Sequence, residues 1–313
     1  MAAAFDRRRV NGPQSRPLLP ALDASASTSA STSRPGPSAS STSSSTTTRP
    51  DGRTPLQHRP IFLQTGLVPS ASGSAYIETG NLKLACSVFG PRQVKGRQYA
   101  GKAELNVEVK FAPFSNRRRR RPGKTTESAT LSALVSQALL PSLRLDLLPK
   151  ASLDIHILVL ESDGPEESCV SAGTIAASTA LASAGIEMYG IVVGAVALLP
   201  SARSSSSAAV AGGPYPLILD PTTSDLSSSN NGARGASRIL LCGMPALSSV
   251  TCLDVRGGAL DPASQVGLQD ERLQEALATM SASLNDIHGV VARALAHDFE
   301  RRRAVLDQPA PST

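Results

Sequence analysis

The sequence predicts a mixed α and β (α+β) fold in which helices pack on sheets. Apolar residues alternate with polar or small residues at 82–88 and again at 152–161, which is the period of a half-buried strand. An Ala-rich stretch at about 170–184 and an apolar repeat of helical spacing at 269–303 indicate helices, the second of them long and amphipathic. Such a mixture of patterns is typical of a layered domain with one apolar core.

The first elements are expected to be strands. Two strand-like runs, 75–78 and 82–88, flank Thr79-Gly80-Asn81, which is a turn signal, so they predict a hairpin. We expect Gly90-Pro91 to end the hairpin, because proline cannot donate a hydrogen bond to a neighbouring strand. A third strand is predicted at 103–111.

A helix is predicted after this strand. Thr125 or Thr126 is expected to cap it, with Glu127 and Ser128 in its first turn, because a hydroxyl at that position satisfies free backbone N–H groups. We expect Pro141 to end or kink this helix, because proline lacks the N–H that the helix needs.

The middle of the chain reads as strand, helix and strand. The strand at 152–161 and the helix at 170–184 are followed by Gly185, at a place where the left-handed end of a helix favours glycine. A buried strand is predicted at 191–199.

Two segments rich in Ser and Gly, 201–213 and 224–237, predict mobile surface loops. Strands are expected between and after them, at 217–220, 238–243 and 249–255, with a turn at 257–258. The long helix at 269–303 completes the fold. Before Arg49, the composition is dominated by Ser, Thr, Ala, Pro and Gly, so residues 1–48 predict a disordered tail.

Composition narrows the range of functions. The net charge is +6, and one run of five arginines, at 117–121, accounts for most of it, which favours a local anionic partner. Aromatic residues make up 3% of the chain and Trp is absent, so RNA binding by extensive base stacking is poorly supported.

The four cysteines form no CxxC pair, which argues against a zinc site. No apolar run has the length of a membrane span. The basic, Ser-rich start also allows a mitochondrial transit peptide as the alternative to a polar tail.

Several segments, in this order, resemble the ribonuclease PH family. They are RPDGR and RPI at 49–61, GSAYIETGNLKLACSVFGPR at 73–92, FAPFSNRRRRRPG at 111–123, SAGTIAASTALASAGIEMYGIVVG at 171–194 and LILDPT at 217–222. Each is weak alone, but their order over about 250 residues makes the resemblance specific. Among family members they look most like eukaryotic RNA exosome ring subunits of the mRNA-transport-regulator type.

The resemblance implies a ribonuclease PH-like fold of two sheet-and-helix halves, which we place at 49–200 and 201–305, with a short tail at 306–313. It also implies a ring with other ribonuclease PH-like subunits, a cap of S1 and KH domain subunits, and RNA as the ligand. The location would be the nucleus and nucleolus, and also the cytoplasm. A subunit of this kind would be unstable or insoluble alone, because its apolar interfaces would be exposed.

Active members of the family hold phosphate with a Gly-Thr-Arg sequence at a helix N-terminus, where free N–H groups and an arginine attract the anion. Here the corresponding segment, 163–168, lacks the arginine and carries Glu166 and Glu167. A carboxylate about 4 Å from phosphate opposes binding by on the order of 4 kcal/mol near a protein surface. The segment therefore predicts a helix cap and not an anion site.

Active members also carry two aspartates six positions apart, which hold a metal ion. Asp220 fits the first position, but Leu226 stands at the second, and Asp225 is one position short. On a strand, one position turns a side chain to the other face. We therefore expect no catalytic residues, with Asp220 vestigial, and neither a metal nor a cofactor.

The arginine run lies in a predicted loop, and the matching loop of active relatives faces RNA. By this resemblance, the RNA-binding residues are expected to be Arg117, Arg118, Arg119, Arg120, Arg121 and Arg92. Arginine suits this role because its planar fork matches phosphate. The alternative is a solvated surface or a nuclear-import patch.

The leading hypothesis is thus a structural, RNA-guiding ring subunit. Two others remain: an active phosphate-dependent 3′-to-5′ exoribonuclease, and an RNA-binding module acting outside any ring. The four histidines show no metal-binding or Ser–His–Asp pattern and are expected to be structural or on the surface.

Overall fold

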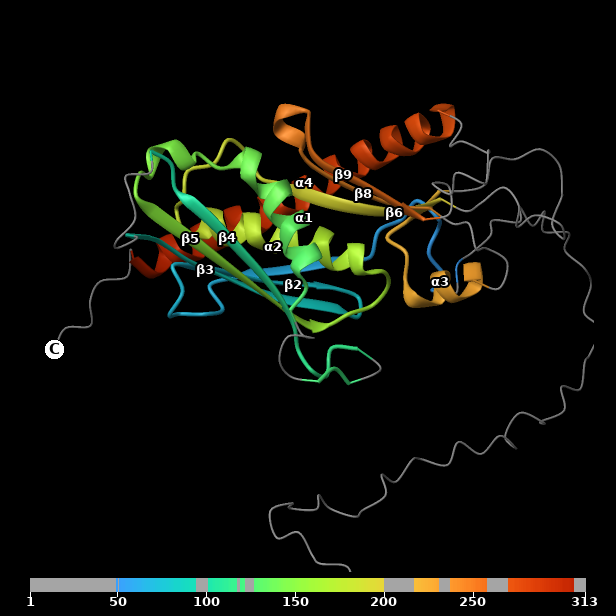
Figure 1. Ribbon diagram of the computed structural model, residues 1–313, viewed down its shortest axis with the longest axis horizontal. Helices are drawn as coiled ribbons and strands as arrows, with labels where there is room; N and C mark the ends of the chain where they lie inside the picture. Colours follow the sequence, from blue (N-terminus) through green and yellow to red (C-terminus); the bar gives the residue numbers. More distant parts are fainter. Residues whose placement is uncertain are drawn as a thin grey trace, which may run out of the picture. The chain divides into compact units, whose positions relative to one another are not determined.

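A computed structural model describes Arg49 and residues 51–93, 101–116, 119–121, 127–199, 217–230, 237–257 and 270–306 (Figure 1). The predictions for the tail at 1–48, the loop at 201–213 and the capping Thr125 and Thr126 lie outside these residues. The described part of the chain contains a mixed sheet and an antiparallel sheet, a helix between them, a long C-terminal helix and shorter helices.

Five strands form the first sheet, in the order β1-β2-β3-β5-β4. Their bounds are β1 Ile61–Thr65, β2 Gly73–Thr79, β3 Leu82–Gln93, β4 Glu104–Phe111 and β5 Ala151–Glu161. β2 and β3 form the predicted hairpin, with Thr79 opposite Leu82. Alternate β5 residues from Leu153 to Val159 are buried, so one face of the sheet supports the core.

The prediction that Gly90-Pro91 ends the hairpin strand is wrong. β3 continues to Gln93, which lies opposite Ala151 of β5. The ladder is irregular between Phe89 and Arg92, and the cis Gly90-Pro91 peptide falls within that irregularity. A bulge removes the need for a ladder hydrogen bond at the proline, so the strand passes through it.

α1 Ala129–Leu139 begins later than predicted. Glu127 pairs with Lys110 in an isolated β-bridge, and Ser128 is the N-cap residue without a side-chain capping bond. Glu127 and Ser128 are therefore not in the first turn, because pairing with β4 holds this segment extended. The end of α1 is as predicted, since a short 3₁₀ turn, Leu140–Ser142, contains Pro141.

The second sheet has the order β7-β6-β8-β9. Its strands are β6 Val193–Leu199, β7 Ile218–Leu219, β8 Ser237–Met244 and β9 Ser249–Gly257. The prediction of a mobile loop at 224–237 is wrong for its first part, which is helix α3 Thr223–Asn230. Asp225 in its first turn accepts hydrogen bonds from Thr222 N at 2.9 Å and Thr222 Oγ1 at 3.0 Å, which stabilises the helix start.

α2 Glu166–Ser183 lies between the two sheets and contacts β2 and β3 on one side and β6 and β8 on the other. Nearly all of its residues are buried, so it has no polar face. Small residues let it approach β6 closely: Ser171 Oγ and Ser178 Oγ donate hydrogen bonds of 2.7 Å to the Gly194 and Val192 carbonyls. The helix is rich in Ala because strands pack closely against it on both sides and leave little room for large side chains. Gly185 after it has φ +73°, as predicted.

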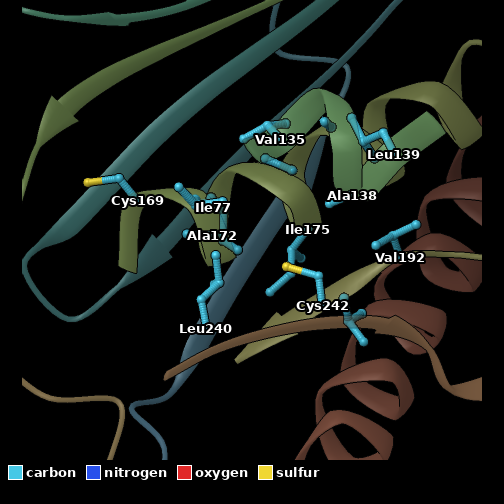
Figure 2. Close-up of a cluster of buried hydrophobic side chains, with 14 of the residues drawn as sticks. Ile77, Val135, Ala138, Leu139, Cys169, Ala172, Ile175, Val192, Leu240 and Cys242 are labelled. Carbon is cyan, nitrogen blue, oxygen red and sulfur yellow. The ribbon is translucent and has the colours of Figure 1, made fainter. Parts of the chain in front are cut away.

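The core extends across this helix. Figure 2 shows Ala172 and Ile175 of α2 among Ile77 of the first sheet and Leu240 and Cys242 of the second. α4 Asp270–Leu306, close to the predicted 269–303, packs on β1, β6 and β8. Its buried apolar residues follow helical spacing, and they are Ala276, Met280, Leu284, Ile287 and Val291. In the part of the chain that the structure describes, no helix combines the length and apolar character needed to cross a bilayer.

Candidate functional site

Arg59, Asp163 and Asp220 come together from three distant parts of the chain. Arg59 precedes β1, Asp163 lies between β5 and α2, and Asp220 follows β7. Arg59 Nε and Nη2 donate to the two carboxylate oxygens of Asp220 at 2.7 and 2.5 Å. Arg59 Nη1 lies 3.4 Å from Asp163 Oδ2. The guanidinium fork thus binds Asp220 in the bidentate way that carboxylates favour.

Burial and pairing act in opposite directions on these two charges. Burial alone would lower the pKa of Arg59 and raise the pKa of Asp220, because it disfavours the charged forms. The hydrogen bonds and opposite charge of the partner outweigh burial, so the pKa of Arg59 is raised and that of Asp220 is lowered. Both groups are charged at neutral pH, and both Asp220 oxygens are held by this chain.

A second buried pair lies beside the first. Arg49 Nη2 donates to the Leu219 carbonyl at 2.7 Å and lies 3.4 Å from Asp225 Oδ2. Burial lowers the pKa of Arg49 despite the charge of Asp225. Arg59 therefore holds Asp220, and Arg49 holds Asp225. Between these two aspartates the chain enters α3. The strand argument about Asp225 does not apply, because the residue is helical.

The start of α2 carries two glutamates with different surroundings. Pro165 is the N-cap, and Glu166 and Glu167 occupy the first turn. The Glu167 side chain is 2% exposed and lies 3.3 Å from Arg238 Nη1, whereas Glu166 is 59% exposed and lies 3.7 Å from Arg120 Nη2. Carboxylates are favoured at this helix end by its dipole. The position that holds an anion in other helices is therefore already negative here.

The turn before α2 leaves little space. Gly164 has φ +95°, and a Cβ placed on it would lie 2.6 Å from the Pro221 carbonyl. Only glycine fits this close approach and this backbone conformation. The turn before α2 and the segment after Asp220 are thus in direct contact.

The described residues of the arginine run, Arg119, Arg120 and Arg121, lie between β4 and α1 and belong to neither a helix nor a strand. Arg117 and Arg118 lie outside the described residues, and Arg119 and Arg121 are exposed. Arg120 is turned toward the protein: its guanidinium carbon lies 4.0 Å from the centre of the Phe111 ring. The run therefore combines exposed arginines with one that is held in place.

Arg92 lies on β3 after the cis proline. It is exposed, and its guanidinium carbon lies 5.2 Å from the centre of the Phe89 ring. Phe89 also packs edge-on against His156, which lies 2.9 Å from Glu108 Oε2. The cation is thus fixed on the solvent side of the first sheet.

The family described as "3' exoribonuclease family, domain 1" (RNase PH) matches residues 57–187. The human protein named "Exosome complex component MTR3" is 35% identical over 218 residues, which are 65% of this chain and 73% of that protein. The chain belongs to the RNase PH family.

One further relative and one solved structure are also similar to this chain. The Arabidopsis thaliana protein named "Exosome complex component RRP41-like" is 36% identical over 211 residues, covering 67% of this chain and 73% of its own length. The crystal structure of rice Rrp46 aligns with 79% of this chain and 100% of its own, with a TM-score of 0.58 and 20% identity. The structural likeness shows the RNase PH-like fold, two sheets with a long C-terminal helix.

Within this RNase PH family member, the structure brings together residues that the sequence patterns left apart. Asp220 and the α2 glutamates were considered for chemistry, but Arg59, Asp163 and Arg238, which surround them, were missed. Arg59 is the first residue of the RPI motif, which indicated the family resemblance but not the contact with Asp220. Arg238 sits on β8 and gave no signal.

One small cavity lies beside this cluster, between α2, β6 and α4. Its volume is about 30 Å³, and His58, Ser168 and Asp220 are among its lining residues. His58 Nε2 and Ser168 Oγ are buried, and neither has a hydrogen-bond partner. Burial lowers the pKa of His58. A cavity of this size holds water and not a nucleotide. Among the residues described, no group of three or more His, Cys, Asp or Glu side chains is placed to bind a metal.

Proposed function

We propose that this chain is a non-catalytic, RNA-guiding ring subunit of an RNA exosome. In that role it supports 3′-to-5′ RNA processing and degradation, including rRNA maturation and mRNA turnover. The observation that carries the proposal is the α2 start, where Glu166 and Glu167 stand at the helix N-terminus and each pairs with an arginine of this chain. The two relatives named above as exosome components support the assembly part of the proposal.

Acidic residues at the α2 start disfavour the phosphate binding that catalysis would require. An unpaired carboxylate would oppose phosphate by on the order of 4 kcal/mol at about 4 Å, and pairing with Glu166 and Glu167 occupies the two arginines that could otherwise attract the anion. The α2 dipole favours an anion by about 0.3–1 kcal/mol, which is too little to compensate. Asp220 is engaged by Arg59, and Leu226 supplies no carboxylate for a metal ion. Among the described residues, these contacts support a site that holds neither phosphate nor a metal-bound water.

The RNA-guiding part rests on the basic loop. Arg117, Arg118, Arg119 and Arg121, with Arg92, are proposed to contact phosphates, and Arg120 to hold the loop against the protein. Contacts of this kind position a strand without reading its sequence. The partners are other RNase PH-like ring subunits, S1 and KH cap subunits, and RNA, in the nucleus, nucleolus and cytoplasm.

Assembly is tested by purifying the tagged chain from its native cells and identifying the co-purifying proteins by mass spectrometry. The expected result is several RNase PH-like proteins and S1/KH proteins in equal amounts. Recovery of the chain alone, or with unrelated proteins, would overturn the ring assignment and favour an RNA-binding module acting alone.

Catalysis is tested separately with recombinant chain, assembled with its partners when it is insoluble alone. RNA is incubated in phosphate buffer, and nucleoside diphosphates are measured against a mock purification and against a complex lacking this chain. We expect no release that depends on this chain. Release that disappears with the chain would establish the alternative, an active phosphate-dependent exoribonuclease.

A further inference from the structure

Phe114 is an exposed aromatic residue in the same loop as the arginine run. Its side chain is 67% exposed, although its neighbours Ala112 and Ser115 are 5% and 3% exposed. Single exposed apolar side chains are common and need no explanation by themselves. The surroundings of Phe114 distinguish it, because they fix where the ring lies and what lies next to it.

The turn that carries Phe114 is anchored on both sides. Ser115 N donates to the Ala112 carbonyl at 2.9 Å, and Ser162 N, after β5, donates to the Ser115 carbonyl at 3.0 Å. Ser162 Oγ donates to Asn116 Oδ1 at 2.5 Å. The backbone on either side of Phe114 is thus tied to the end of β5. The side chain is exposed, on the segment that follows β4 and projects from the first sheet in Figure 1.

The arginine run is tied to the same turn. Arg120 N donates to the Pro113 carbonyl at 2.9 Å, which places the run next to Phe114. The Arg120 side chain is held between the Phe111 ring and Glu166. Its neighbours Arg119 and Arg121 are exposed. An outward aromatic ring therefore lies beside exposed guanidinium groups on a fixed loop.

We propose that Phe114 stacks on a base of single-stranded RNA while the adjacent arginines hold the flanking phosphates. This inference rests on the proposed RNA-guiding function and names residues that would perform it. Single strands are bound by this combination, because an aromatic ring accepts any base and cations follow the backbone. Aromatic and arginine side chains also occur at protein interfaces, but an RNA strand supplies closely spaced phosphates for a run of like charges as well as a base for the ring. Arg120 is a positioning residue that fixes both groups.

The test uses the assembled complex that contains the full chain. Its affinity is measured for an oligouridine and for a strand of equal length and charge whose sugars carry no bases, each at several salt concentrations. Phe114→Ala is expected to weaken oligouridine binding by about fivefold or more. It should leave both the base-free strand and the salt dependence unchanged. Arg119→Gln is expected to weaken both strands and to reduce the salt slope by about 0.7.

Phe299→Ala is the matched control, because Phe299 on α4 is also 67% exposed and lies outside the loop. It should change neither affinity, and Phe114→Trp should retain binding. Photo-crosslinking with 4-thiouridine should place a crosslink on the peptide that contains Phe114.

If Phe114→Ala binds like wild type while Arg119→Gln is weakened, stacking is overturned and the proposed function stands. Loss of Phe114→Ala from the complex would instead identify a contact to a neighbouring subunit. If the wild-type chain contributes no RNA affinity to the complex, the RNA-guiding function itself fails.

Discussion

Arg59 binds both carboxylate oxygens of Asp220 across 161 positions of the chain. The side chains are 6% and 16% exposed, so this pair joins the segment before the first sheet to the segment after β7 in a largely dry environment. Asp220, which the sequence predicted to be a vestigial catalytic residue, forms an ion pair within the chain.

Removing Arg59 should therefore destabilise the fold strongly. Arg59→Met leaves the largely buried Asp220 with only Arg53 Nη1, 3.7 Å away, as a charged partner, so the cost approaches the about 3–5 kcal/mol of a broken buried pair. Lys83→Met is the control, because the Lys83–Glu161 pair has side chains 37% and 49% exposed and such pairs contribute about 0–1 kcal/mol. Pulse proteolysis of the complex in urea, with this chain followed on a gel, measures both. Equal losses for the two variants would contradict the structural role of Arg59.

The same pair predicts acid sensitivity. The pKa of Asp220 is lower in the folded chain than in the unfolded chain, so its contribution to stability is present above the unfolded value, about 4, and is lost as pH falls through the folded value. Asp220→Asn should be less stable than wild type at neutral pH and should lose less stability on acidification below about pH 4. The measurement is a series of unfolding curves at stepped pH values. Parallel pH profiles for the two proteins would refute the linkage.

Glu167 and Arg238 should respond unequally to substitution. Arg238→Ala leaves Glu167, which is 2% exposed, charged and without its partner, at a cost of about 1–3 kcal/mol. Glu167→Gln should cost less, because the Arg238 side chain is 36% exposed and can be solvated. Urea midpoints of the two variants check this order. The reverse order would mean that Glu167 is stabilised mainly by the α2 dipole.

Gly194 should not tolerate a side chain. A Cβ there would lie 2.9 Å from both Ser171 Cα and Thr174 Oγ1, so Gly194→Ala must separate α2 from β6, which costs about 1–3 kcal/mol. Gly289→Ala on α4 is the control, since nothing lies within 4 Å of its Cβ position. It should stabilise the helix by about 0.5–1 kcal/mol. Thermal unfolding of both variants decides whether the close contact at Gly194 is as tight as described.

Periodicity accounts for the elements that the sequence predicted correctly. Alternation at 152–161, the turn at Thr79-Gly80-Asn81 and the apolar repeat of α4 each reflect burial on one face, which is visible in a short window. α3 was missed because its Ser-rich sequence has no apolar repeat. Its formation depends on Asp225, which accepts hydrogen bonds from Thr222 and pairs with Arg49 far away in the sequence.

The site could be predicted in part. The glutamates of the α2 start were identified from the sequence, because helix starts favour acidic residues and the resemblance located the segment. Their partners Arg120 and Arg238 could not be, since ion pairs between distant segments leave no periodic signal. Phe114 was discounted with the other aromatics, because composition does not show that one ring lies beside an arginine loop.

The position of α2 between the sheets couples the unfolding of one sheet to that of the other. A helix without a polar face cannot remain in water when either sheet leaves it, so separation of the sheets is tied to the loss of the whole core. The two sheets therefore form one cooperative unit. Amide hydrogens of β5 and β8 should exchange with solvent through the same global unfolding event, and neither half should fold as an isolated fragment.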